Sequence, residues 1–206
     1  MRIINDLPQH LPDGTANPDW LALRAGKFTG SDFLVMLGKG ETKRKMILEK
    51  ATEHILGKPC NKERFVSADM LRGIEMEDVA RQLYVEETFN EVEQVAFVEK
   101  DEFSGCSPDG LVGTDGMVEI KCPKDTVFVE QSISQTIRPE YYTQIQFGLY
   151  ITERKWCDYI AYNENFPLLI RRYYRDEQHI KEIETALDDG IKSVKEIIKN
   201  FTNRKE

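Results

Sequence analysis

The sequence has no long apolar segment. No stretch approaches the roughly 20 apolar residues that a membrane-spanning helix requires. The first residues, MRIINDLPQHLPDG, also lack the hydrophobic core of a secretory signal. We therefore expect a cytoplasmic protein with no membrane association. Its 206 residues, 40% hydrophobic and 31% charged, are typical of a soluble globular protein that is long enough to bury a real core.

Paired cysteines are lacking as well. The four cysteines lie at positions 60, 106, 122 and 157, with no C-x-x-C pair and no spacing typical of zinc ligands. They also form no cluster of three after the strands around residue 120, which disfavours an iron–sulfur centre. We expect reduced and mostly buried thiols.

An overall excess of basic charge is absent. The net charge is −8, and residues 75–102 carry ten acids against two bases, which leaves 26 acids and 26 bases elsewhere. This balance argues against non-specific nucleic-acid binding. Local basic surfaces remain possible around residues 39–45 and at Arg171–Arg172. The overall acidity therefore does not exclude a DNA partner whose phosphate charge is neutralised by basic residues inside a groove.

Helical periodicity, capping residues and short β-rich runs predict an order of elements. The expected helices cover residues 18–25, about 29–38, 42–57, 68–89, 139–152 and 176–203, and the expected strands cover 92–100, 103–107, 116–122, 155–163 and 168–174. This order predicts an α/β (α+β) fold with a central mixed sheet flanked by helices. We expect a single domain over residues 1–206, with a helical front end at about 17–90, a sheet core at about 92–175 and a C-terminal helix at about 176–203.

The stretch SPDGLVGTDGMVEIK, residues 107–121, predicts a hairpin that turns near Thr114. Asp109 and Glu119 lie five residues on either side of this turn, so they are expected to face each other on adjacent strands. Two carboxylates placed so closely repel unless a cation lies between them. Hard oxygen ligands of this kind favour Mg²⁺ or Mn²⁺.

Strand alternation places Lys121 on the same face as Glu119, while Ile120 points to the opposite layer. The Lys121 ammonium would then orient an attacking water and stabilise the charge of a phosphodiester transition state. The alternative is a plain hairpin, in which Asp109 shapes the turn and Glu119 and Lys121 form a solvated face.

Five segments decide between these readings because they occur together and in order over about residues 20–150. They are LRAGKFTGSDF (23–33), the G-x-x-x-E of Gly73–Glu77, SPDGL (107–111), EIKCP (119–123) and YYTQIQFGLY (141–150). Together they resemble the phage lambda exonuclease family, also called YqaJ-like viral recombinases, within the PD-(D/E)XK nuclease superfamily. The resemblance implies the restriction-endonuclease-like fold of that superfamily with a helical N-terminal part.

The resemblance also implies roles for individual residues. Asp109, Glu119 and the Ile120 carbonyl match metal ligands, Lys121 matches the catalytic lysine, Glu77 matches a helix glutamate that binds or positions a second metal, and Arg24, Ser31, Ser107 and Gln144 match positions that hold the DNA phosphate, including the 5′-phosphate end. An apolar Met70 ahead of the Glu77 helix would act as a wedge between the DNA strands, with core packing as the alternative.

Three of the phosphate-binding positions, and Glu77, also have a plainer interpretation. Arg24 would cap its own helix, Ser31 would be an N-cap, Gln144 would be a polar position on a buried helix face, and Glu77 would be one more acid in an acidic run. For Arg24 the family reading has a physical basis, since a guanidinium binds phosphate in a bidentate manner.

The family implies a function as well as a site. We expect a Mg²⁺-dependent exonuclease, with Mn²⁺ as a substitute and two ions per active site. It would digest the 5′-ended strand of linear double-stranded DNA and leave a 3′ overhang for recombination. A homotrimeric ring around DNA and a single-strand annealing protein as partner are further expectations. The alternatives are a sequence- or structure-specific endonuclease of the same superfamily, or a catalytically silent scaffold that binds DNA ends.

Overall fold

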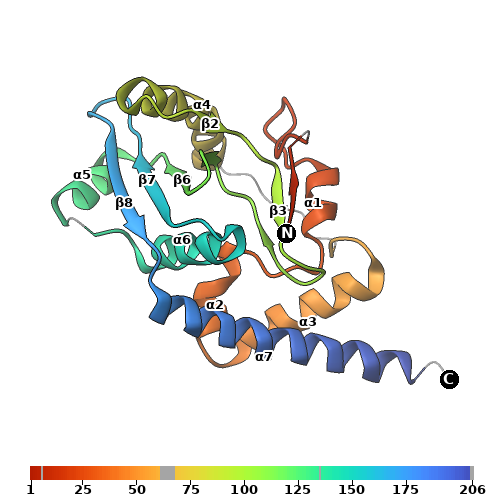
Figure 1. The fold of residues 1–206 in the computed structure, drawn as a ribbon. Coiled ribbons are helices and arrows are strands. Elements are labelled where there is room, and N and C mark those ends of the chain that lie inside the picture. The colour runs from red at the N-terminus through yellow and green to blue at the C-terminus, as the bar shows by residue number, and fades with distance from the viewer. Residues whose placement is uncertain (6, 61–67, 135, 205–206) are drawn as a thin grey trace.

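A five-stranded mixed sheet forms the centre of the molecule (Figure 1). The computed structural model describes residues 1–5, 7–60, 68–134 and 136–204, without the side chains of residues 68–70. In sheet order, the strands are β2 (Val92–Glu93), β5 (Gly110–Val112), β6 (Gly116–Lys121), β7 (Trp156–Ala161) and β8 (Leu169–Tyr174). Only β6 and β7 run parallel in this sheet, and the chain between them forms the helical crossover that parallel pairing requires.

A second, three-stranded antiparallel sheet is built from β1, β3 and β4. These strands cover Arg2–Ile4, Phe97–Glu99 and Gly105–Cys106. The single strand expected over 92–100 is therefore wrong, because β2 joins the central sheet whereas β3 joins the small one. Strand β1 was not predicted, and it forms because Ile4 and Arg2 pair with Phe97 and Glu99.

The helices follow the predicted order closely. They are α1 (Pro18–Arg24), α2 (Phe33–Leu37), α3 (Glu41–Leu56), α4 (Ala68–Thr88), α5 (Asp125–Ser134), α6 (Pro139–Thr152) and α7 (Glu177–Thr202), with a short 3₁₀ turn, η1, at Gly30–Asp32. The helix expected over about 29–38 is divided into η1 and α2, and α5 was not predicted. No helix in the described ranges has the length and apolarity to cross a bilayer.

The two faces of the central sheet bury different helices. On one face, Val118 and Ile120 of β6 pack with Ala80 and Tyr84 of α4. On the other face, Met117 packs in a larger core that includes residues of α6 and of α7, which crosses the molecule beside α2 and α3 (Figure 1). The sheet flanked by helices is confirmed, and Ile120 points away from Glu119 as the alternation predicts.

Candidate active site

The β5–β6 hairpin brings the predicted carboxylates together. Gly110 pairs with Val118, so the residue before β5, Asp109, lies opposite Glu119 in the same register. The Asp109 Oδ2 accepts a hydrogen bond of 2.6 Å from the Ile120 main-chain N–H. The acids therefore face each other across the hairpin, as their spacing around Thr114 predicts.

Close packing explains why each strand of this hairpin begins with a glycine. A Cβ at Gly110 would come within 2.2 Å of Val92 Cγ1, and a Cβ at Gly116 would come within 2.2 Å of the Trp156 ring. At the turn itself, Gly113 adopts a φ of +49°, which other residues rarely adopt. The Arg154 guanidinium donates to the carbonyls of Val112, Gly113 and Gly116 and fixes the turn.

Glu119 is the buried centre of the site, with 2% of its surface exposed. One carboxylate oxygen, Oε1, accepts a hydrogen bond of 2.6 Å from Gln144 Nε2 on α6 and also contacts the Lys121 ammonium. Burial raises the pKa of Glu119, Lys121 opposes this shift, and Asp109 adds to it. Burial lowers the pKa of Lys121. The neighbouring Glu119 and Asp109 raise it by more than burial lowers it, so the net shift of the pKa is upward.

Glu77 of α4 completes an acidic cluster, defined here as Glu77, Asp109 and Glu119. Burial raises the pKa of Glu77, the charge of Asp109 raises it further, and Arg81 lowers it. Arg81 Nη2 donates to Glu77 Oε1 at 2.6 Å. The helix glutamate therefore lies near enough to the hairpin acids for their charges to interact.

A second group of residues surrounds the Arg24 side chain. The Arg24 guanidinium donates to Ser107 Oγ at 3.0 Å and to Thr29 Oγ1 at 3.2 Å, and it stacks on the Trp20 ring at 4.4 Å. Ser31 Oγ lies 3.3 Å from Thr29 Oγ1. We call Arg24, Thr29, Ser31 and Ser107 the Arg24 network.

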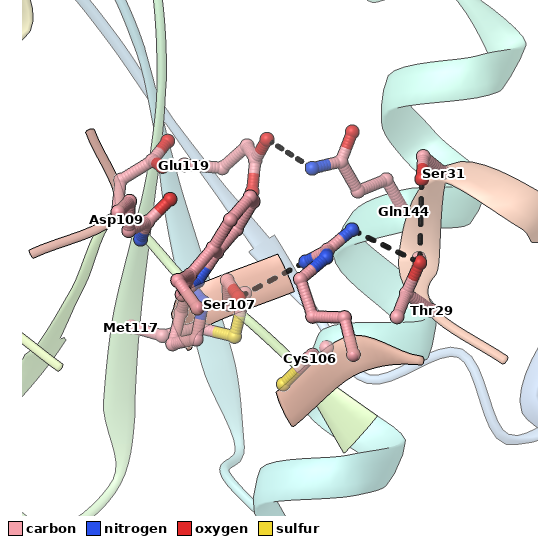
Figure 2. Close-up of a pocket in the computed structure, with 14 residues that line it drawn as sticks. Thr29, Ser31, Cys106, Ser107, Asp109, Met117, Glu119 and Gln144 are labelled. Carbon is pink, nitrogen blue, oxygen red and sulfur yellow. Dashed lines mark hydrogen bonds between the residues drawn. The ribbon is translucent and has the colours of Figure 1, made fainter. Parts of the chain in front are cut away.

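One cavity of about 180 Å³ joins the acidic cluster to the Arg24 network. Figure 2 shows Asp109 and Glu119 at one end, Thr29 and Ser31 at the other, and Gln144 between them. The turn that carries Thr29 and Ser31 approaches α6 closely, since a Cβ at Gly30 would lie 2.9 Å from Gln144 Cγ. Six predicted site residues thus line this cavity, namely Arg24, Ser31, Ser107, Asp109, Glu119 and Gln144, and Lys121 contacts Glu119.

The donor set suits a hard divalent cation. Asp109, Glu119 and the Ile120 carbonyl would supply oxygen ligands. A bound cation would offset both the cost of burying the Glu119 charge and the repulsion from Asp109, the two causes that raise the pKa of Glu119. Over the described part of the chain, no group of three His, Cys, Asp or Glu side chains is arranged to hold a metal ion. A metal would therefore depend on the main-chain carbonyl as well as on the two hairpin carboxylates.

Other sequence expectations have mixed outcomes. The side chain of Met70, expected as a strand-separating wedge, lies outside the described residues. Cys106 and Cys157 are buried free thiols, as expected, whereas Cys60 and Cys122 are only partly buried. Gln146, which shares the polar character of Gln144, instead bonds the main chain of Tyr174 and Asp176 at the start of α7.

Sequence reasoning missed three residues of the site: Trp20, Thr29 and Arg81. Trp20 and Arg24 are four residues apart on α1, and this spacing was a usable signal for their contact. Thr29 connects Arg24 to Ser31, and it is held by a capping interaction in which its N–H donates to Asp32 at 2.8 Å. Arg81 resembled any base on an acidic helix and gave no signal.

Paired carboxylates and a lysine on a mixed sheet, beside a pocket lined by an arginine and its hydroxyl partners, are the arrangement of a nuclease. The fold and the site therefore define an enzyme of the nuclease class. The chain belongs to the YqaJ-like viral recombinase family, since the model of the YqaJ-like viral recombinase domain matches residues 19–155. The resemblance seen in the five motifs is confirmed.

Solved structures agree with this family. The crystal structure of an alkaline exonuclease, LHK-Exo, from Laribacter hongkongensis is 30% identical with a TM-score of 0.83, covering 91% of this chain and 97% of that one. The same values hold for LHK-Exo in complex with dAMP. A phage-related exonuclease from Haemophilus somnus 129PT shares the fold, with 14% identity, a TM-score of 0.62 and coverage of 85% and 96%. No curated protein matched the sequence.

Proposed function

We propose that this chain is a Mg²⁺-dependent exonuclease that digests the 5′-ended strand of linear double-stranded DNA. It releases mononucleotides and leaves a 3′ overhang for recombination. The carrying observation is the single cavity that holds the hairpin carboxylates at one end and the Arg24 network at the other. Family membership and the likeness to an alkaline exonuclease support the same activity.

The acidic cluster is the proposed metal site. Asp109, Glu119 and the Ile120 carbonyl would hold one Mg²⁺, and Glu77 would bind or position a second ion, with Mn²⁺ as a substitute. A bound Mg²⁺ activates water at neutral pH and stabilises negative charge on a phosphoryl oxygen. The buried position of Glu119 keeps its carboxylate fixed between Lys121 and Gln144 while the substrate changes.

Lys121 acts as a cation in this proposal. Glu119 and Asp109 raise the pKa of its ammonium above the ordinary value, so the group is protonated at neutral pH. A protonated lysine cannot accept a proton from water, but it can orient an attacking water and stabilise developing charge on the phosphate. Its contact with Glu119 Oε1 holds the ammonium beside the metal-binding carboxylates.

The Arg24 network is the proposed site for the 5′-phosphate. The Arg24 guanidinium offers planar, charge-assisted donors that suit a phosphate group, and the Ser31 and Ser107 hydroxyls line the same cavity. Gln144 lies between this site and Glu119, where its amide would position the terminal nucleotide. A pocket that binds a terminal phosphate next to the carboxylates would explain cleavage from an end and the preference for the 5′-ended strand.

The proposal extends to the assembly. One exonuclease domain over residues 1–206 would form a homotrimeric ring around DNA and act with a single-strand annealing protein. The acids of residues 75–102 other than Glu77 would then lie away from the DNA channel, and the basic clusters would face it.

Digestion of matched DNA substrates tests the proposal. With Mg²⁺, linear duplexes carrying a 5′-phosphate should lose the 5′-ended strand, and closed circular duplexes should stay intact. Cleavage of closed circles would instead indicate the endonuclease alternative. Cleavage rates on end-labelled duplexes with 5′-phosphate or 5′-hydroxyl ends test the Arg24 network. Equal rates on the two kinds of end would exclude an end-phosphate pocket. Binding without any cleavage would indicate the silent scaffold.

A further inference from the structure

Helix α3 supports the Arg24 network from outside the cavity. None of the described residues that line the cavity belongs to α3. Three of its side chains, Lys50, Glu53 and His54, nevertheless lie against the segment 26–32, which connects α1 to α2 and contains η1. Positions i, i+3 and i+4 share one face of a helix. One turn of α3 therefore holds this segment at both of its ends.

Glu53 holds the beginning of the segment. It is 8% exposed, and its Oε2 accepts a hydrogen bond of 2.9 Å from the Gly26 N–H, two residues after Arg24. Gly26 has a φ of +74°, and an added Cβ there would lie 2.7 Å from the His54 ring. The chain thus leaves α1 through a turn that requires glycine, and Glu53 binds the main chain of that turn.

Lys50 holds the end of the segment through Asp32. The Lys50 ammonium lies 3.1 Å from Asp32 Oδ2, and the two side chains are 12% and 15% exposed. The same Oδ2 accepts from the Thr29 N–H at 2.8 Å and from the Thr29 hydroxyl at 3.1 Å. Because a hydroxyl has one proton to donate, Asp32 fixes its direction and leaves the lone pairs of Thr29 Oγ1 to accept from Arg24 at 3.2 Å.

The charge of Asp32 has to be balanced at this place. An unpaired carboxylate next to Thr29 would repel an incoming phosphate, and solvent would screen this repulsion weakly because the Asp32 side chain is mostly buried. The Lys50 ammonium removes the net negative charge. Asp32 can therefore orient Thr29 by hydrogen bonds without opposing the anion that the Arg24 network is proposed to bind.

We infer that Lys50 and Glu53 of α3 are positioning residues for the 5′-phosphate. Glu53 fixes the turn that follows Arg24, and Lys50 balances Asp32, which orients the hydroxyl partner of the Arg24 guanidinium. The preference for a phosphorylated DNA end then depends on a helix that does not line the cavity. This inference rests on the proposed function, because it assumes that the Arg24 network binds the end phosphate.

Single-turnover cleavage of duplexes with 5′-phosphate and 5′-hydroxyl ends tests the inference. Lys50→Met should lower the rate on 5′-phosphate ends by about ten-fold, as for one hydrogen bond to a charged group, and leave the rate on 5′-hydroxyl ends nearly unchanged. In an Arg24→Ala background the same substitution should have no further effect, because it acts through that guanidinium. An equal loss on both kinds of end, or an undiminished loss without Arg24, would overturn the inference.

The wild type separates this inference from the proposed function. Equal wild-type rates on the two kinds of end would overturn the end-phosphate pocket and the inference with it. A wild-type preference for 5′-phosphate ends that Lys50→Met retains would overturn the inference alone and leave the pocket standing.

A double variant tests the charge balance. Asparagine at position 32 keeps an oxygen that can accept from Thr29 but carries no charge. Asp32→Asn combined with Lys50→Met should therefore regain most of the end preference that Lys50→Met loses. A double variant with no more preference than Lys50→Met would refute the role given to the ion pair.

Glu53→Met tests the other end of the segment and does not depend on the folding of Lys50→Met. It removes the acceptor of the Gly26 N–H and should also lower the rate on 5′-phosphate ends selectively, by roughly ten-fold. Arg175→Met is the matched control, because Arg175 likewise binds a carbonyl, that of Leu149, and an acid, Glu177, but does not line the cavity. An equal change of end preference in Arg175→Met would refute the inference. Circular dichroism confirms that each variant is folded.

Discussion

The two ends of the active-site cavity are built in different ways. At one end, Asp109, Glu119 and Lys121 come from thirteen consecutive residues, 109–121, that form one hairpin. At the other end, the members of the Arg24 network come from α1, from η1 and its cap, and from the segment before the hairpin. The hairpin end depends on local strand geometry, whereas the Arg24 end depends on how distant segments pack.

The two ends of the cavity also differ in their charge and in the groups they present. The hairpin end concentrates negative charge, and burial raises the pKa of Glu119 there. The Arg24 end presents a guanidinium with hydroxyl partners and an aromatic ring beneath it. The proposed cation-binding end and the proposed phosphate-binding end are complementary if one substrate phosphate lies at each. Variants that affect one end alone would test whether the hairpin end serves hydrolysis and the Arg24 end serves recognition of the DNA end.

Lys121→Ala should have the largest effect, because it removes a charge from the reacting centre. We expect hydrolysis to fall by about 1,000-fold, the upper range for one stabilising donor, while the affinity for duplex DNA stays nearly unchanged. Single-turnover digestion and fluorescence anisotropy measure these two quantities. Lys155→Ala is the control, since Lys155 is exposed and pairs with Asp115 on the turn, away from the cavity. Unchanged cleavage by Lys121→Ala would remove this lysine from the mechanism.

Arg24→Ala should have the next largest effect, and its effect should depend on the DNA end. Loss of a charge-assisted phosphate contact costs about 1.5–3 kcal/mol, or roughly 10- to 150-fold in rate on 5′-phosphate ends. On 5′-hydroxyl ends the same variant should cleave at nearly the wild-type rate. The exposed Arg204 provides the control variant, Arg204→Ala. An equal loss on both ends would mean that Arg24 supports the fold of the cavity and does not read the end phosphate.

The hairpin end was predictable from sequence because strand alternation has a fixed period. The spacing around Thr114 placed Asp109 opposite Glu119, and the period of two placed Ile120 on the opposite face of the sheet, where it packs against α4. Of the two helices between the parallel strands β6 and β7, α6 was predicted and α5 was not. The helix α5 was missed because its run, DTVFVEQSIS, is rich in β-branched residues that also suit strands.

The Arg24 end could be predicted only through the family resemblance. Nothing in the local pattern indicates that Ser107 would meet Arg24 across 83 residues of chain. Thr29 was missed because its place depends on a cap with Asp32 and on the approach of Gly30 to α6. Contacts of this kind arise from tertiary packing, which a periodic pattern does not encode.

Gln144→Ala tests the junction between the two ends. Gln144 donates to Glu119 and lines the cavity next to Ser31, so its removal should affect both reaction and recognition. We expect about a ten-fold loss in cleavage rate, as for one hydrogen bond to a charged group. Single-turnover rates on 5′-phosphate and 5′-hydroxyl ends measure it, with the exposed Gln178 mutated to Ala as the control. A Gln144→Ala loss that simply adds to that of Arg24→Ala would show that the two ends act independently.

Ser31→Ala should have the smallest effect and therefore sets the finest test of the comparison. Its hydroxyl contacts Thr29 at 3.3 Å, so it reaches Arg24 only through that threonine. A neutral hydrogen bond contributes about 1 kcal/mol, which corresponds to a loss of roughly five-fold on 5′-phosphate ends. Because the Ser31 hydroxyl belongs to the proposed phosphate-binding end, Mn²⁺ affinity measured by paramagnetic resonance should not change. A shift in Mn²⁺ affinity would show that the turn at Thr29 also positions Gln144 against Glu119, so that recognition of the DNA end and assembly of the metal site are one property of the cavity.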